Sequence, residues 1–183
     1  METEDFELAE AGETQSRLLA VTALTNEYCS LVEGARENEK TDFVEKACRL
    51  LPAIYLDFTD PTLKEEALMP DFGGEMLSTY VDEDFYEAVR RNIEVLLGPD
   101  DTFLETFEED MKYSESPIAA SVGECMADIF QALYNFISLV RESEGLSTIE
   151  AYLSCRDDFN SYWGQTLCNV MRPLNTLRVN DGE

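Results

Sequence analysis

The chain has 183 residues, of which 39 are Asp or Glu, 13 are Lys or Arg and none is His, so its formal net charge is −26. This charge argues against binding to a nucleic-acid backbone, which requires clustered Lys and Arg. The lack of histidine excludes Ser-His-Asp and Cys-His catalysis and every zinc site that contains a His ligand. Hydrophobic residues make up 44% of the chain, which is enough to build the core of a single domain.

The N-terminal segment does not look like an export signal. Its first 13 residues, METEDFELAEAGE, contain six acids and no base, whereas a signal peptide begins with basic residues followed by an apolar run. No apolar run approaches the roughly 20 residues needed to span a bilayer. The five cysteines are odd in number and form no Cys-x-x-Cys motif, so we expect them to be reduced and mostly buried. These features predict a soluble, cytoplasmic protein.

Apolar residues recur at intervals of three and four, and strand-like alternation is almost absent. This periodicity predicts an all-α fold, a single-domain helical bundle of about five main helices plus one or two short helices. We expect a disordered acidic tail over residues 1–13, the bundle over residues 14–178 and a C-terminal tail over residues 179–183.

In chain order, the first long helix should cover residues 14–33, and a second should run over about 42–58 with a kink or break at Pro52. Residues 59–79 contain two prolines and a Gly-Gly pair, so they should form the longest irregular connection. The third helix should cover residues 82–97, beginning at three acids and ending at Gly-Pro.

The second half of the chain predicts three more helices. A short acidic helix should follow over about residues 100–110, capped by one of two adjacent aspartates. Ser116-Pro117 has the form of a helix start and predicts a long helix over residues 117–142. A capping box at residues 147–150 opens the last helix, which should reach about residue 178.

The helix predicted over residues 117–142 is the least charged part of the chain. Between Ser116 and Val140, its only Asp, Glu, Lys or Arg residues are Glu124 and Asp128. These two share a narrow polar stripe with three uncharged residues, Ser121, Gln131 and Asn135. Carboxylates four residues apart lie one helical turn apart and could form half of a site for a hard cation. The simpler interpretation is a solvated stripe, and a third is a stripe that faces another element of the fold.

Arg156 lies on the apolar face of the predicted last helix, between Tyr152 and Trp163. An unpaired buried charge is costly, so we expect its guanidinium to be buried and paired with a carboxylate on another helix, such as Glu124 or Asp128. Two alternatives stay open: Arg156 grips an anionic ligand beside the two aromatic rings, or its stem runs along the edge of the core.

Trp163 is the only tryptophan, and Gly164 follows it in the middle of the predicted helix. Glycine at such a position costs about 1 kcal/mol relative to alanine. We interpret this glycine as a point where a ring or another backbone packs closely, with a binding role for Trp163 as the alternative.

A resemblance to a known family is carried by three segments in this order: VRRNIEVLLGPDDTFLETF, GECMADIFQALYNF and CRDDFNSYWGQTL. Together with an LLP-x-x-Y step at residues 50–55, they resemble the bacterial all-helical family designated domain of unknown function five-zero-six-three, over roughly residues 15–177. The resemblance implies a helical cytosolic domain of unestablished biochemistry. Relatives carry histidines around the Trp-Gly step where this chain has Tyr162 and Thr166, so any metal held by such histidines could not be bound here.

Three functions are compatible with this sequence. We predict a non-catalytic interaction module whose partner is another protein. The alternative is a carboxylate-lined metal or small-molecule site, such as an Mg²⁺- or Mn²⁺-dependent hydrolase, built from the acids of the stripe with Asp157 or Asp158. The third is mimicry of a nucleic acid, although the acids are spread evenly along the chain.

The candidate binding residues are Glu124, Asp128, Arg156 and Trp163. We predict no catalytic residue, no metal ligand and no cofactor. Neither a nucleic acid nor a membrane is expected as a partner, and the sequence leaves the oligomeric state open.

Overall fold

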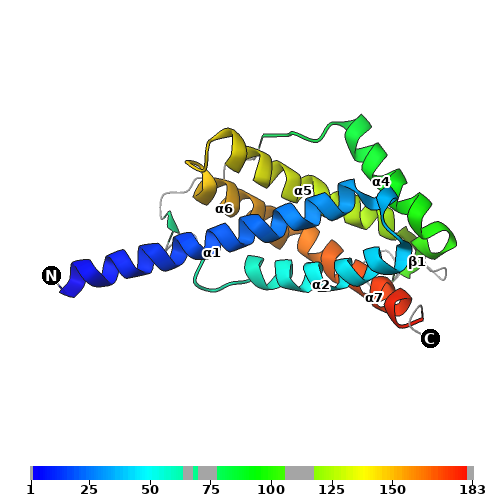
Figure 1. The fold of residues 1–183 in the computed structure, drawn as a ribbon, viewed down its shortest axis with the longest axis horizontal. Coiled ribbons are helices and arrows are strands. Elements are labelled where there is room, and N and C mark those ends of the chain that lie inside the picture. The colour runs from blue at the N-terminus through cyan, green and yellow to red at the C-terminus, as the bar shows by residue number, and fades with distance from the viewer. Residues whose placement is uncertain (1, 64–67, 70–77, 106–117, 181–183) are drawn as a thin grey trace.

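The computed structural model describes residues 2–63, 68–69, 78–105 and 118–180, with only the backbone given for residues 2–10. The described residues form an all-α bundle (Figure 1), as the periodicity predicts. Its helices are α1 (Glu2–Glu33), α2 (Lys40–Phe58), α4 (Glu83–Leu97), α5 (Val122–Glu142), α6 (Thr148–Asp158) and α7 (Gly164–Asn180). A π-helical turn, η4 (Phe159–Trp163), joins α6 to α7, so these three elements form one continuous helical segment.

Helix α5 is the centre of the bundle and packs against α1, α4, α6 and α7. Its low charge explains this position, because Met126, Ile129, Leu133 and Phe136 are all fully buried and burying such side chains is the main favourable contribution to folding. Helix α2 closes the other side by packing against α1 and α7.

An aromatic cluster forms where the end of α2 meets α6 and η4. The Phe58 ring stacks on Tyr152 and on Phe159 at centroid distances of 5.3 and 5.7 Å, and meets Trp163 edge-on at 4.9 Å. Pro52 lies inside α2, which continues through it without a break. Of the predicted kink or break at Pro52, the break does not occur, because the buried residues on both sides of the proline hold the helix against the core; the kink stays a prediction.

The segment after α4 differs from the prediction of a short acidic helix over residues 100–110. Residues Gly98–Asp101 form a 3₁₀ turn, η2, and Thr102–Glu105 form strand β1, which pairs antiparallel with strand β2 at Ile118–Ser121. Residues 106–110 lie outside the described residues. The β-branched and aromatic residues Thr102 and Phe103 favour a strand at this point, and β1 pairs with β2 in a small sheet near the end of the bundle where the C-terminus lies (Figure 1).

Helix α5 therefore begins at Val122 and not at residue 117. Ser121 is its N-cap: the Ser121 hydroxyl accepts a hydrogen bond from the Glu124 backbone N–H at 3.0 Å. The Asp101 carboxylate also accepts from the Gly123 N–H at 2.7 Å. Both contacts satisfy amide groups that a helix start leaves free, and the Asp101 contact joins the start of α5 to the η2 turn that follows α4.

The two ends of the chain extend the bundle. Helix α1 begins at Glu2, and its first turns project beyond the other helices (Figure 1). The backbone of Glu2–Glu13 continues α1 before the predicted helix start at residue 14; glutamate and alanine favour helices, and acids stabilise a helix N-terminus. The disorder expected of residues 1–13 stays a prediction. At the other end α7 reaches Asn180, and residues 181–183 lie outside the described residues.

Two further properties bear on the environment of the protein. All five cysteines are free; Cys29 and Cys155 are buried, while Cys168 is exposed. Among the helices of the described residues, none combines the length and the apolar character needed to cross a membrane.

Candidate functional site

The predicted polar stripe of α5 faces other elements of the fold at Asp128. This half-buried carboxylate accepts two phenol hydrogen bonds of 2.6 Å: Tyr86 of α4 donates to Oδ1, and Tyr162 of η4 donates to Oδ2. Burial, followed by the bond to this acidic acceptor, raises the pKa of both phenols well above the ordinary tyrosine value, so both stay protonated donors. We call this arrangement the Asp128 clasp, since it ties α4, α5 and η4 together.

Two other residues of the stripe differ in their surroundings. Asn135 accepts a hydrogen bond from the Tyr80 backbone N–H at 2.8 Å, so it anchors the chain just before α4. Glu124 is exposed. Among the residues the structure describes, no three Asp, Glu or Cys side chains lie close enough together to hold a metal ion. Glu124 and Asp128 thus differ in role: within the part of the chain that the structure describes, Asp128 is the one of the two that accepts side-chain hydrogen bonds from other elements.

Arg156 does not make the predicted contact with an acid of α5. Its guanidinium is half-buried and donates to the backbone carbonyl of Leu63, while Asp128 is bonded to tyrosines instead. Within the described ranges, no ion pair joins Arg156 to a carboxylate of another helix. The prediction of a buried ion pair with Glu124 or Asp128 is therefore wrong. The physical reason is that a carbonyl oxygen satisfies the guanidinium donor without requiring a second buried charge.

Trp163 is fully buried and donates from Nε1 to the carbonyl of Cys155 at 3.2 Å. The next residue confirms the packing interpretation: a Cβ at Gly164 would lie 2.6 Å from the Phe159 carbonyl oxygen and 3.0 Å from its ring. Trp163 therefore belongs to the core. The four predicted site residues do not converge on one site.

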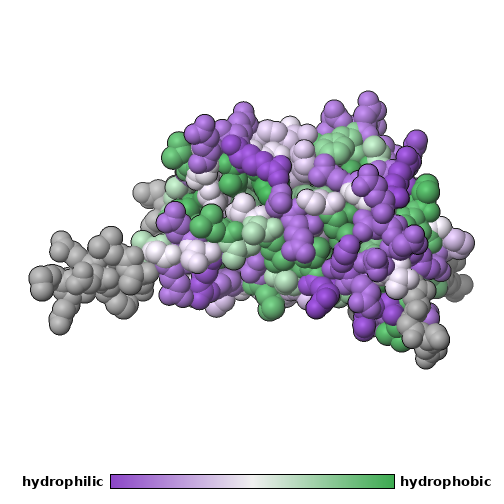
Figure 2. All heavy atoms as spheres, viewed as in Figure 1, coloured by the Kyte–Doolittle hydropathy of each residue, from purple (hydrophilic) through white to green (hydrophobic). Residues whose placement is uncertain are grey.

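A groove elsewhere on the surface of the described structure has a volume of about 890 Å³. It lies between the first half of α1 and the turn that joins α5 to α6. Figure 2 shows hydrophobic surface between these two elements, bordered by hydrophilic surface. We call it the α1 groove; the residues used below are Glu13, Arg17, Leu18, Leu19, Thr22, Val140, Glu144, Leu146 and Ile149, all of which line it.

Two leucines make this groove unusual for a protein surface. Leu19 of α1 is 63% exposed, and Leu146 of the α5–α6 turn is 88% exposed. Single exposed leucines are common, but two that line the same hollow form an apolar patch, and such patches often mark binding sites.

The turn that carries Leu146 has a fixed geometry. The Gly145 N–H donates to the Val140 carbonyl at 2.8 Å, and the Glu144 N–H donates to the Arg141 carbonyl at 3.1 Å. This pair of bonds is a Schellman motif, which ends α5. Glu144 occupies its left-handed position with φ of 53°, where a glycine is usually found because side chains are strained there. The turn therefore holds Leu146 and Glu144 at the rim of the groove at a cost in stability.

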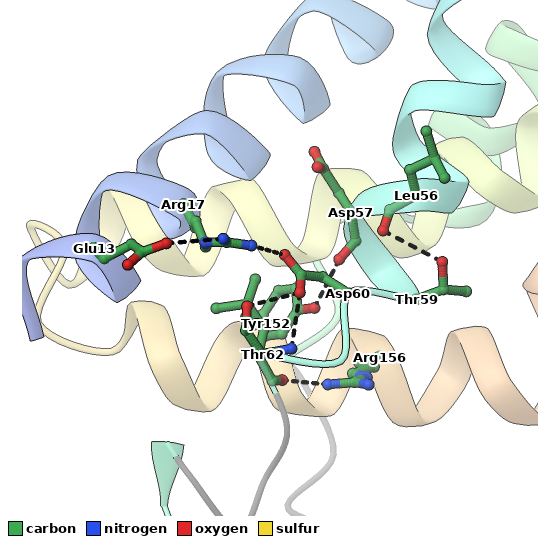
Figure 3. Close-up of polar contacts among 10 residues, drawn as sticks. Glu13, Arg17, Leu56, Asp57, Thr59, Asp60, Thr62, Tyr152 and Arg156 are labelled. Atoms are coloured by element: carbon green, nitrogen blue, oxygen red, sulfur yellow. Dashed lines mark hydrogen bonds and ion pairs between the residues drawn. The ribbon is translucent and has the colours of Figure 1, made fainter. Parts of the chain in front are cut away.

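The opposite wall is fixed by Arg17, as Figure 3 shows. Its guanidinium pairs with Asp60 at 2.5 Å and with Glu13 at 2.9 Å. Asp60 in turn accepts from the hydroxyl and the backbone N–H of Thr62 at 2.7 and 2.8 Å. Burial opposes ionisation of Asp60, but the bonds from Thr62 and Arg17 hold its pKa below the ordinary value. These contacts attach the chain beyond α2 to α1.

The same segment is attached to α6 by two further bonds (Figure 3). The Tyr152 hydroxyl donates to the Asp57 carbonyl at 3.0 Å, and Arg156 donates to the Leu63 carbonyl. The carboxyl of Asp57 has a raised pKa because it is partly buried and lies near Asp60. Arg156 thus attaches the segment that follows α2 to α6, a role that its apolar position did not predict.

Sequence reasoning did not identify the α1 groove. Its residues are separated in sequence by more than a hundred positions, and only the tertiary fold brings them together. The one local signal is Glu144-Gly145-Leu146, a helix end followed directly by a large apolar residue.

Comparison with known proteins places the chain in a family. The family described as domain of unknown function (DUF5063) matches residues 13–180. The chain belongs to this family. The crystal structure of protein BF1032 from Bacteroides fragilis superposes with a TM-score of 0.70 at 24% identity, and the match covers 88% of this chain and 92% of that one. No curated protein matches the chain. For this DUF5063 member, the comparisons support the helical fold and do not say what the protein does.

Proposed function

We propose that this DUF5063 domain is a non-catalytic module that binds a segment of another protein in the α1 groove. The observation that carries the proposal is the pair of exposed leucines, Leu19 and Leu146, on opposite walls of a groove whose walls are fixed by the Arg17 ion pairs and by the Schellman turn. A preformed apolar groove lowers the entropy cost of binding, because its walls do not have to be ordered by the partner.

The chemistry of the other candidate residues supports a binding role over catalysis. Both oxygens of Asp128 already accept a phenol hydrogen bond, and among the described residues no three His, Cys, Asp or Glu side chains gather to hold a metal ion, so the carboxylate-site alternative has little support. The nearby Cys125 is a poor nucleophile, since burial, followed by the negative charges around it, raises its pKa to about 12.

The free cysteines agree with a reducing compartment, and we propose a bacterial cytoplasm as the location.

Capture of proteins from a lysate of the source organism tests the proposal, with matched leucine variants. Leu19→Glu and Leu146→Glu place a charge in the groove, and Leu56→Glu is the control, because Leu56 is 69% exposed and does not line the groove. We expect wild type and the Leu56 variant to capture the same proteins and both groove variants to lose them, with all melting curves cooperative. Identical capture by all four proteins, or capture of nothing by wild type, would overturn the proposal.

A further inference from the structure

The chemistry of the α1 groove specifies the segment that it binds. We infer that this segment is an amphipathic helix with leucine-like residues on one face and Lys or Arg on its flanks; this inference rests on the proposed function. It has two independent components, the apolar walls and the charge around them.

The apolar component follows from the shape of the walls. On one side, Leu18, Leu19 and Thr22 follow the axis of α1. On the other side, Val140, Leu146 and Ile149 come from the end of α5, the turn and the start of α6. A trough between a helix and a turn accepts a third helix, whose apolar side chains at intervals of three and four residues fill the hollow.

The charge component follows from the rim. Among the described residues that line the groove, Arg17 is the single base, and it is already neutralised by Glu13 and Asp60. Glu144 adds an exposed carboxylate on the other side. The chain as a whole carries a net charge of −26, so its long-range field is also negative. A basic segment therefore meets a complementary field, and an acidic one is repelled.

The position of Glu144 gives this component separate support. Its φ of 53° is one that glycine adopts without strain. The turn nevertheless carries a charged side chain at the rim, and strained residues persist where their side chains serve a binding site.

Three synthetic peptides of equal length test the inference by fluorescence anisotropy. The first has leucines at helical spacing and lysines elsewhere, the second replaces each lysine with glutamate, and the third scrambles the first so that the apolar face is lost. We expect the first peptide to bind one to one and roughly tenfold or more tighter than the other two. Leu146→Glu should weaken it by about tenfold, although this variant adds a negative charge that favours a basic peptide, whereas Leu56→Glu should have no effect. Added salt should weaken binding.

Each contrary result has a distinct meaning. Equal binding of the scrambled peptide would show that only net charge is recognised, and equal binding of the glutamate peptide would remove the charge component; either overturns the inference. No peptide binding, combined with groove-dependent capture from lysate, would overturn the partner chemistry and leave the proposed function standing. A wild-type dimer that Leu146→Glu dissociates, and Leu56→Glu does not, would make a second copy of the chain the occupant and overturn the inference.

Discussion

Replacement of Gly164 by alanine tests the packing of the π-helical turn, the part of the fold on which the last helix depends. The added Cβ would lie 2.6 Å from the backbone oxygen of Phe159 and 3.0 Å from its Cε2. The oxygen belongs to the backbone, and the ring is held by Phe58 and Trp163, so neither can move freely. Overpacking of this kind costs up to about 3 kcal/mol, whereas the alanine gains about 1 kcal/mol in helix propensity. The expected net loss is about 2 kcal/mol.

Urea denaturation followed by circular dichroism measures this loss, and thermal melting should show a fall of about 4–8 °C in Tm for a chain of this size. Gly12→Ala is the matched control, since Gly12 lies in α1 with nothing within 4 Å of its added Cβ. That variant should leave the free energy of unfolding unchanged or raise it slightly. If Gly164→Ala were as stable as Gly12→Ala, the close approach of the Phe159 carbonyl would be refuted.

Tyr86→Phe and Asp128→Asn, measured singly and together by urea denaturation, should show a coupling energy of about 1 kcal/mol; additive effects would contradict the Asp128 clasp. The pKa of Asp60 is lowered in the folded state, so its stabilising effect should be complete above its unfolded pKa of about 3.9 and disappear as the pH falls through the lower folded value; a stability difference between wild type and Asp60→Asn that persists at the lowest pH would contradict this. Glu144→Gly should stabilise the protein by about 1 kcal/mol and should weaken binding of the peptide that carries leucines and lysines. A destabilised variant would refute the claim that the Glu144 backbone is strained. A strong reductant should leave the melting curve unchanged, because all five cysteines are free; loss of the cooperative transition would contradict the assignment.

The helical class and most of the helix positions could be predicted, since apolar residues at three- and four-residue intervals determine which face is buried. Ser116-Pro117 has the form of a helix start, but α5 begins only at Val122, because residues 118–121 pair with β1 as strand β2. Strand β1 was missed because its four residues are too short to show a periodicity, and its pairing with β2 is a tertiary contact.

The site was harder to predict than the fold. The apolar setting of Arg156 predicts a carboxylate partner, but sequence could not distinguish a carboxylate from the Leu63 carbonyl that accepts its hydrogen bond. The stripe on α5 identified Asp128 as exceptional, yet its partners Tyr86 and Tyr162 come from other elements. No sequence pattern marks an exposed residue such as Leu146 as part of a binding site, because that role depends on the α1 residues that lie across the groove.

The central claim, that the α1 groove holds a basic amphipathic helix of another protein, is tested most directly by cross-linking in cells. A photo-activatable amino acid replaces Leu146 in one protein and Leu56 in a second, and mass spectrometry identifies the cross-linked peptide. We expect a discrete adduct from position 146 alone, whose peptide has leucine-like residues at helical spacing with flanking Lys or Arg. Position 146 giving no adduct, or the same adducts as position 56, would contradict the claim.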